Sequence, residues 1–140
     1  MTSTLQTVLF ACVHNAGRSL MAAAFFNQLA DPKKARAVSA GTQPSTSAHP
    51  EVVTVMQEVG VDLRTAVPRL LTPEVATGTL WLITMGCGES CPVVPGARRE
   101  DWPLDDPKGQ PVDRVRAIRD DIHRRVLELI ASRGWGRPTV

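Results

Sequence analysis

The stretch from residue 7 to residue 29 most constrains the fold, because its character changes twice within a few residues. Residues 7–11 are mainly apolar and predict a buried strand, residues 12–18 form a short polar loop, and residues 19–29 have helical composition. A strand, a tight loop and a helix N-terminus in this order place successive backbone N–H groups around one point, where the helix dipole adds partial positive charge. The stretch therefore predicts an anion-binding loop.

Strands and helices alternate along the rest of the chain. Further strands are expected at residues 35–39 and 79–85, and further helices from Pro50, from Pro73 and from Val112 to Arg133. This alternation favours an α/β fold with a mostly parallel sheet covered on both faces. In such folds ligands lie beyond the carboxyl ends of strands, which is where the polar loop begins.

Composition excludes several classes of function. A net charge of +2 with no basic tail argues against nucleic-acid binding, and the apolar runs are too short to span a membrane. The first residues lack the basic and apolar regions of an export signal, so we expect a cytoplasmic protein. An odd number of cysteines, three, argues against a disulfide framework and leaves reactive thiols or metal binding open.

The loop carries a thiol at its start and a guanidinium at its end. Five residues separate Cys12 from Arg18, a spacing that allows one tight ring with the N–H groups of residues 13–18 pointing inward. These groups, the helix N-terminus and Arg18 favour a thiolate at Cys12, and Arg18 is suited to hold two oxygens of an oxyanion. A bound tetrahedral oxyanion would therefore face a nucleophile. The residues expected to bind it are Val13, His14, Asn15, Ala16, Gly17, Arg18 and Ser19.

Four of these residues also have individual expectations. Gly17 is expected to adopt a backbone angle that other residues resist, and Asn15 to be an internal strut in a left-handed conformation. Ser19 is placed to donate its hydroxyl to the Cys12 sulfur, and His14 is expected to face solvent. The alternative is an inert buried thiol at a strand end, but it explains neither the spacing nor the small polar loop.

Residues 12–19 (CVHNAGRS) resemble the phosphate-binding loop of the low-molecular-weight tyrosine phosphatase fold, and the whole chain is most similar to its arsenate reductase branch. The similarity extends to residues 39–41 (SAG), 84–92 (TMGCGESCP) and 102–107 (WPLDDP). The resemblance implies a three-layer αβα fold with a central, mostly parallel four-stranded sheet. It also implies one domain spanning residues 1–140, without a cofactor or a metal and monomeric.

The resemblance further implies reduction of arsenate to arsenite by a thiol relay, as in arsenic detoxification. Cys12 would attack arsenate, Cys87 would then attack Cys12 to release arsenite, and Cys91 would move the redox-active disulfide outward. Asp106 matches the family's general acid, with Asp105 as its neighbouring competitor. Phosphate and sulfate would compete with arsenate for the loop.

The electron donor stays open. The resemblance implies regeneration by thioredoxin, but the short spacing of Cys87 and Cys91 also resembles members that transfer arsenate to mycothiol and use a glutaredoxin-like partner. Ala23 and Arg69 stand where several relatives have acidic residues near a potassium site. The resemblance therefore implies no potassium here, with Arg69 as a candidate replacement charge.

Two other functions remain alternatives. The first is a low-molecular-weight protein tyrosine phosphatase, for which Cys12, Arg18 and Asp106 would suffice. Against it, Lys108 follows the Asp-Pro pair, and the chain contains no tyrosine to wall a phenyl ring. The second is a non-enzymatic module that binds arsenite or zinc through the three thiols, whose spacing does not match a standard zinc site.

Overall fold

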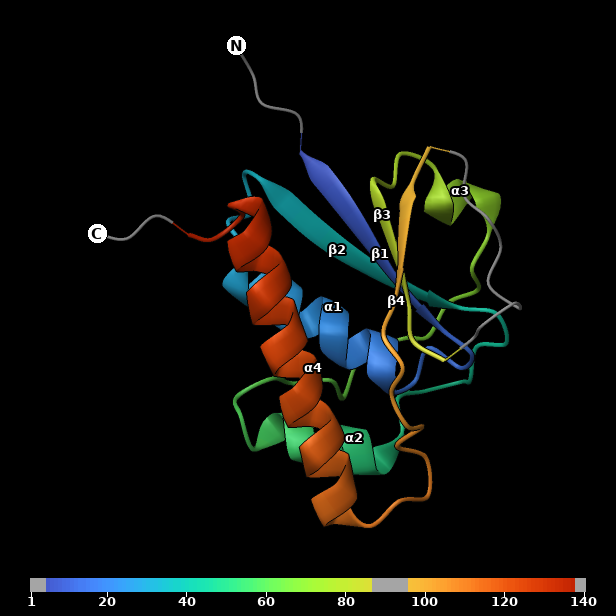
Figure 1. Ribbon diagram of the computed structural model, residues 1–140. Coiled ribbons are helices and arrows are strands. Elements are labelled where there is room, and N and C mark those ends of the chain that lie inside the picture. The colour runs from blue at the N-terminus through green and yellow to red at the C-terminus, as the bar shows by residue number, and fades with distance from the viewer. Residues whose placement is uncertain (1–4, 87–95, 138–140) are drawn as a thin grey trace.

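A computed structural model describes residues 5–86 and 96–137 of the chain. Figure 1 shows a twisted sheet whose strands all run from the end near the N-terminus towards the end where the Cys12 loop lies. The elements, in chain order, are β1 (Gln6–Cys12), α1 (Arg18–Leu29), β2 (Ala35–Gly41), α2 (Pro50–Gln57), α3 (Pro73–Ala76), β3 (Trp81–Thr84), β4 (Arg98–Asp101) and α4 (Val112–Arg133).

The sheet has the strand order β2-β1-β3-β4, and every pair of neighbours is parallel. β1 lies between β2 and β3, so Val8 is opposite both Ala37 and Trp81. Both faces of β1 are buried, which explains its nearly continuous apolar sequence. The expected four-stranded, parallel α/β fold is confirmed.

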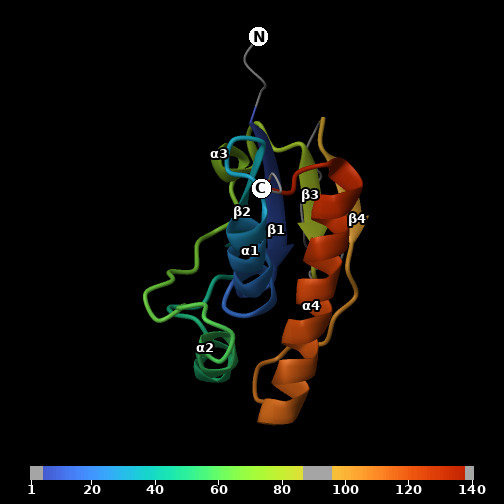
Figure 2. The same cartoon turned by 90° about the vertical axis from the view of Figure 1, so that its left-hand side faces the viewer.

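Alternate residues of β1 enter two separate apolar clusters. Val8, Phe10 and Cys12 pack in the larger cluster, together with side chains of α1, α2 and α4. Leu9 and Ala11 pack in a smaller cluster with Ala76 of α3. Figure 2 shows α3 and α4 on opposite sides of the strands. The sheet is therefore the middle layer of three, with a thin second helical layer.

Several predicted boundaries differ from the structure, and one strand was not predicted at all. β2 continues to Gly41 because Gly41 pairs with Cys12, whereas the expected strand at 79–85 is shorter and spans only Trp81–Thr84. No pattern indicated the location of β4, whose sequence is Arg-Arg-Glu-Asp and whose residues are all exposed. Charged side chains on an edge strand oppose pairing with another chain. Because the composition of these four residues does not favour a strand, their extended conformation depends on pairing with β3.

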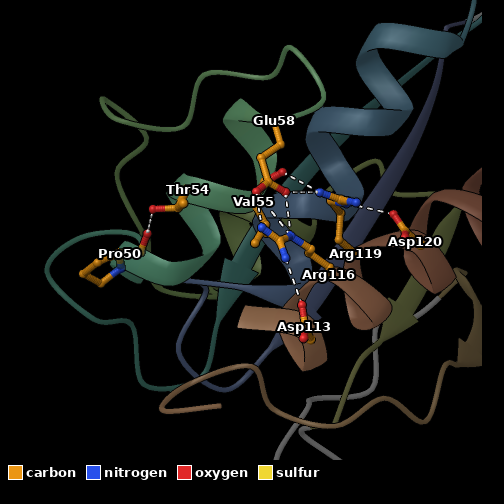
Figure 3. A network of polar contacts seen from close by, with 8 residues as sticks. All are labelled: Pro50, Thr54, Val55, Glu58, Asp113, Arg116, Arg119 and Asp120. Carbon is orange, nitrogen blue, oxygen red and sulfur yellow. Dashed lines mark hydrogen bonds and ion pairs between the residues drawn. The ribbon is translucent and has the colours of Figure 1, made fainter. Parts of the chain in front are cut away.

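α4 begins and ends as its apolar spacing predicts, with Gly134 in the left-handed conformation after Arg133. Figure 3 shows how α4 is tied to the end of α2. The carboxylate of Glu58 accepts hydrogen bonds from Nη2 of Arg116 (2.7 Å) and Nη1 of Arg119 (2.9 Å), and Arg119 Nη1 also donates to the carbonyl of Val55 (2.8 Å). The hydrogen bonds from Arg116 hold the pKa of Glu58 below its ordinary value.

Within the described residues, no helix combines the length and the hydrophobicity that crossing a bilayer requires.

Candidate active site

Cys12 is the last residue of β1, and its side chain is buried at the base of the loop. Its Sγ lies 2.9 Å from Oγ of Ser19 and accepts a hydrogen bond from the backbone N–H of Asn15 at 3.3 Å. Ser19 is in the first turn of α1, so the sulfur lies beside a helix N-terminus. The predicted contact between Ser19 and Cys12 is confirmed. Nearby N–H and O–H groups stabilise a thiolate over a thiol.

Asn15 is the strut that the sequence predicted. It is fully buried, and its φ of 48° is the only positive one at a non-glycine position in the described residues. Its Nδ2 donates to Ser19 Oγ (2.7 Å), and its Oδ1 accepts the backbone N–H of Arg69 (2.9 Å). These two contacts hold the side chain, and they offset the cost of the left-handed backbone.

Arg69 acts on the loop through its backbone. Its carbonyl accepts the N–H of Gly41 (2.9 Å), and its Nε donates to the carbonyl of Ser39 (3.0 Å). The segment around Arg69 thus lies beside the carboxyl end of β2, and its N–H reaches Asn15 from there. The expectation that Arg69 supplies charge to the site stays a prediction.

The outer side of the loop is fixed by the segment that follows β2. Four loop carbonyls accept backbone N–H groups of this segment at 2.8–3.2 Å. The pairs, acceptor first, are Cys12 with Thr42, Val13 with Gln43, His14 with Ser45 and Ala16 with His49. Because its carbonyls bond outward, the loop is shaped before any ligand arrives.

Two glycines are required by space. A Cβ on Gly41 would lie 2.6 Å from the Val13 carbonyl oxygen and 2.9 Å from the Asn15 nitrogen, both backbone atoms that cannot swing away. A Cβ on Gly17 would lie 2.8 Å from Cγ of Pro107. The expectation that Gly17 adopts a backbone angle that other residues resist stays a prediction, and the structure adds a second reason for a glycine. Its φ is −143° and its ψ is −92°, and the close approach of Pro107 leaves no room for a Cβ.

Arg18 starts α1 and reaches across to the segment after β4. The side chain is 7% exposed, Nη1 donates to the carbonyl of Leu104 (3.1 Å), and Nη2 lies 3.8 Å from Oδ2 of Asp106. The guanidinium also lies against Gly86, where a Cβ would come within 2.1 Å of Nη1. Gly86 adopts a φ of 98°, so both its backbone and its neighbour favour a glycine.

The two adjacent aspartates have different surroundings. Asp106 is 43% exposed, faces Arg18, and accepts the N–H of Lys108 at 3.0 Å. Asp105 turns away and forms an ion pair with Arg114 of α4. Only Asp106 is thus placed near the loop, although its bond to Lys108 also fits a turn-forming role.

The sequence reasoning missed His49. His49 is buried where α2 begins, and its backbone N–H donates to the Ala16 carbonyl. The ring Cδ2 would lie 3.4 Å from a Cβ on Gly17. Burial lowers the pKa of His49, and the nearby carboxylates of Glu51 and Asp106 oppose that shift. The available signal was a histidine directly before a proline at a helix start. His14, in contrast, is half-buried, and its Nδ1 lies 3.2 Å from the Gln43 carbonyl oxygen.

Cys87 and Cys91 lie outside the described residues, so the structure brings together only Cys12, Arg18 and Asp106 of the predicted catalytic set. Among residues 5–86 and 96–137, no group of three or more histidine, cysteine or acidic side chains is arranged to hold a metal ion.

The loop geometry agrees with comparison to known proteins. Residues 7–133 match the family model described as low molecular weight phosphotyrosine protein phosphatase. The chain belongs to this family. The match spans every element from β1 to α4, including the Cys12 loop and the segment of Asp106.

The relatives within this family carry arsenate reductase names. A Halobacterium salinarum protein provisionally named an arsenate reductase is 39% identical over 124 residues, which cover 86% of this chain and 87% of that protein. The glutaredoxin arsenate reductase of a Synechocystis species is 34% identical over 131 residues, covering 91% of this chain and 98% of that one. The predicted family and the similarity to its arsenate reductases are confirmed.

A solved structure gives the same assignment. The thioredoxin-dependent arsenate reductase of Corynebacterium glutamicum superposes with a TM-score of 0.80 at 38% identity, and the match covers 94% of this chain. It covers 63% of that longer chain, so this protein spans somewhat less than two thirds of the solved structure's length.

Proposed function

We propose that this chain reduces arsenate to arsenite, with Cys12 as the nucleophile and a thiol reductant as the source of electrons. One observation carries the proposal: the buried Cys12 sulfur lies 2.9 Å from Ser19 Oγ and 3.3 Å from the Asn15 nitrogen at the N-terminus of α1. A thiolate beside an anion-binding loop is suited to attack a bound oxyanion. The arsenate reductase names of the relatives favour arsenate over a phosphate ester as substrate.

The first step forms a bond between Cys12 Sγ and arsenic and breaks one arsenic–oxygen bond. Arg18 holds oxygens that stay on arsenic, and Asp106 donates a proton to the oxygen that leaves as water. The proximity of Arg18 and Asp106, with Nη2 and Oδ2 3.8 Å apart, supports these two roles. Arsenic is still pentavalent at this stage.

The second step transfers the electrons. The Cys87 thiolate attacks Cys12 Sγ, the Cys12–arsenic electron pair stays on arsenic, and arsenite leaves. Two thiols are thereby oxidised to one disulfide while arsenic gains two electrons. Cys91 then attacks Cys87, which frees Cys12 and leaves a Cys87–Cys91 disulfide for the external reductant.

We assign regeneration to thioredoxin, with transfer of arsenate to mycothiol and a glutaredoxin-like partner as the alternative. The thioredoxin-dependent structure from Corynebacterium is similar along most of this chain, which supports the first. The Synechocystis relative is named a glutaredoxin arsenate reductase, so the experiment below also tests the glutaredoxin-like partner.

The test follows NADPH consumption with arsenate in two reconstituted systems, one with thioredoxin and its reductase, the other with mycothiol and its redoxin. We expect rapid turnover with thioredoxin only. Cys12→Ser should abolish turnover, and Cys87→Ser should do the same. If Cys87→Ser turns over normally, the relay is wrong. If neither system consumes NADPH while phosphate esters are hydrolysed, the phosphatase alternative replaces the proposal.

A further inference from the structure

A hollow lies at the opposite end of the sheet from Cys12, where the strands begin. It has a volume of about 400 Å³, and its lining residues come from the starts of β1, β3 and β4 and from the end of α4. The residues that line it are Gln6, Leu80, Trp81, Arg98, Arg133 and Trp135. Apolar and aromatic walls with a few polar groups are typical of small-ligand sites.

The two arginines of this hollow share one aromatic ring. The guanidinium carbon of Arg133 lies 4.2 Å from the centroid of the Trp81 ring, and that of Arg98 lies 5.7 Å from the same centroid. The two cationic groups are therefore separated by no more than the sum of these distances. Both side chains also line the same hollow, so an anion bound there would meet two cationic groups.

Neither arginine has a carboxylate partner within the described parts of the chain. This differs from the arginines of α4 further from its C-terminus, since Arg114, Arg116, Arg119, Arg124 and Arg125 all form ion pairs. The guanidinium groups of Arg98 and Arg133 instead lie over the ring of Trp81. A bound anion would neutralise their positive charge.

Backbone hydrogen bonds fix the walls of the hollow. The N–H of Arg98 donates to the Leu80 carbonyl (2.8 Å), and the N–H of Leu80 donates to the Thr7 carbonyl (2.9 Å). On the other side, the N–H of Trp135 donates to Ile130 (3.0 Å), while its carbonyl accepts the N–H of Asp31 (2.7 Å). Both tryptophans are buried. A ligand would thus enter a preformed site.

We propose that this hollow binds a small organic anion, a carboxylate or phosphate group attached to a flat apolar body. The anionic group lies between the guanidinium groups of Arg98 and Arg133, and the apolar body packs against Leu80 and Trp135. None of the lining residues is a nucleophile or a general acid or base, so the site binds its ligand without transforming it. The proposal is independent of arsenate reduction.

The test is calorimetric titration with naphthoate, a fused-ring carboxylate, in a buffer free of phosphate and sulfate, because these anions would compete for the two arginines. Neutral naphthamide is the matched ligand control. Arg98→Met and Arg133→Met keep an apolar stem and remove the charge, and Arg64→Met, an exposed arginine paired with Asp62, is the matched control variant. Thermal unfolding checks that each variant is folded.

We expect naphthoate to bind, naphthamide to bind at least about tenfold more weakly, and each methionine variant of the hollow to lose about tenfold in affinity. Arg64→Met should bind as the wild type does. In NMR spectra, the indole N–H signals of Trp81 and Trp135 should shift on binding while that of Trp102 stays in place. The proposal is wrong if naphthoate does not bind, if naphthamide binds equally well, or if removing either charge leaves the affinity unchanged.

Discussion

Cys12 Sγ lies 2.9 Å from Ser19 Oγ, and Asn15 Nδ2 donates to that same oxygen at 2.7 Å. The hydroxyl accepts from Asn15 and so has its own hydrogen free for the sulfur, which makes it a donor that favours the thiolate. The three residues are buried together. The reactivity of Cys12 thus depends on its contact with Ser19 and on the hydrogen bond from Asn15 that orients Ser19.

Ser19→Ala should therefore make Cys12 a weaker nucleophile, because the sulfur loses its hydroxyl partner. We expect the alkylation of Cys12 by iodoacetamide to slow by about tenfold, since one hydrogen bond to a charged group is worth about 1.5–3 kcal/mol. The rate is measured by mass spectrometry of the alkylated Cys12 peptide, with Cys12→Ser as the blank. Unchanged alkylation would show that the hydroxyl does not support the thiolate.

The adjacent aspartates provide a matched pair of variants. Because Asp106 faces Arg18 and Asp105 pairs with Arg114, Asp106→Asn should lower kcat for arsenate reduction by about a hundredfold, the range of general acid catalysis. Asp105→Asn should change kcat less than about threefold, as expected for an exposed ion pair. Steady-state kinetics of both variants test this. If both variants lost kcat equally, the assignment of Asp106 as the general acid would be wrong.

Gly41 tests the close packing of the loop. Gly41→Ala would force its new Cβ into the Val13 carbonyl and the Asn15 nitrogen, so the loop must deform and arsenate turnover should fall by more than about tenfold. Gly136→Ala is the matched control, because its Cβ would meet only Ile130 Cγ2 at 3.9 Å. Turnover of Gly41→Ala at the wild-type rate would mean that the loop tolerates an outward shift.

His49 makes the stability depend on pH. Burial lowers the folded-state pKa of His49 below its ordinary 6.5, so the unfolded chain binds the proton more tightly. The contribution of neutral His49 is complete above pH 6.5 and is lost as the pH falls through the folded-state value. Thermal unfolding between pH 7.5 and about pH 5 should show a steeper loss of Tm in the wild type than in His49→Asn. Parallel curves would contradict a buried, neutral His49.

The sequence predicted those parts of the fold whose signal is local. The apolar period and the glycine stop defined α4 from Val112 to Arg133, and the change of composition after Ala11 located the Cys12 loop. β4 was not predicted because its four charged residues form a strand only through pairing with β3. The local composition does not indicate which strand will pair with these residues.

The site follows the same division. Cys12, Asn15, Arg18 and Ser19 lie within eight residues, so spacing alone indicated their contacts. The contributions of Arg69, Gly41 and His49 come from segments that meet the loop through hydrogen bonds between residues distant in sequence, and no spacing rule predicts them. The close contact of Gly17 with Pro107 could not be predicted either, because Pro107 is distant in sequence.

The most direct test of the thiol relay is a single-turnover measurement of arsenite. Fully reduced protein, freed of small thiols, is mixed with arsenate, and the arsenite released per chain is quantified. The relay predicts about one arsenite per chain, because two thiols supply the two electrons, and none from Cys12→Ser. Arsenite from Cys12→Ser, or from the wild type only after a small thiol is added, would contradict the relay.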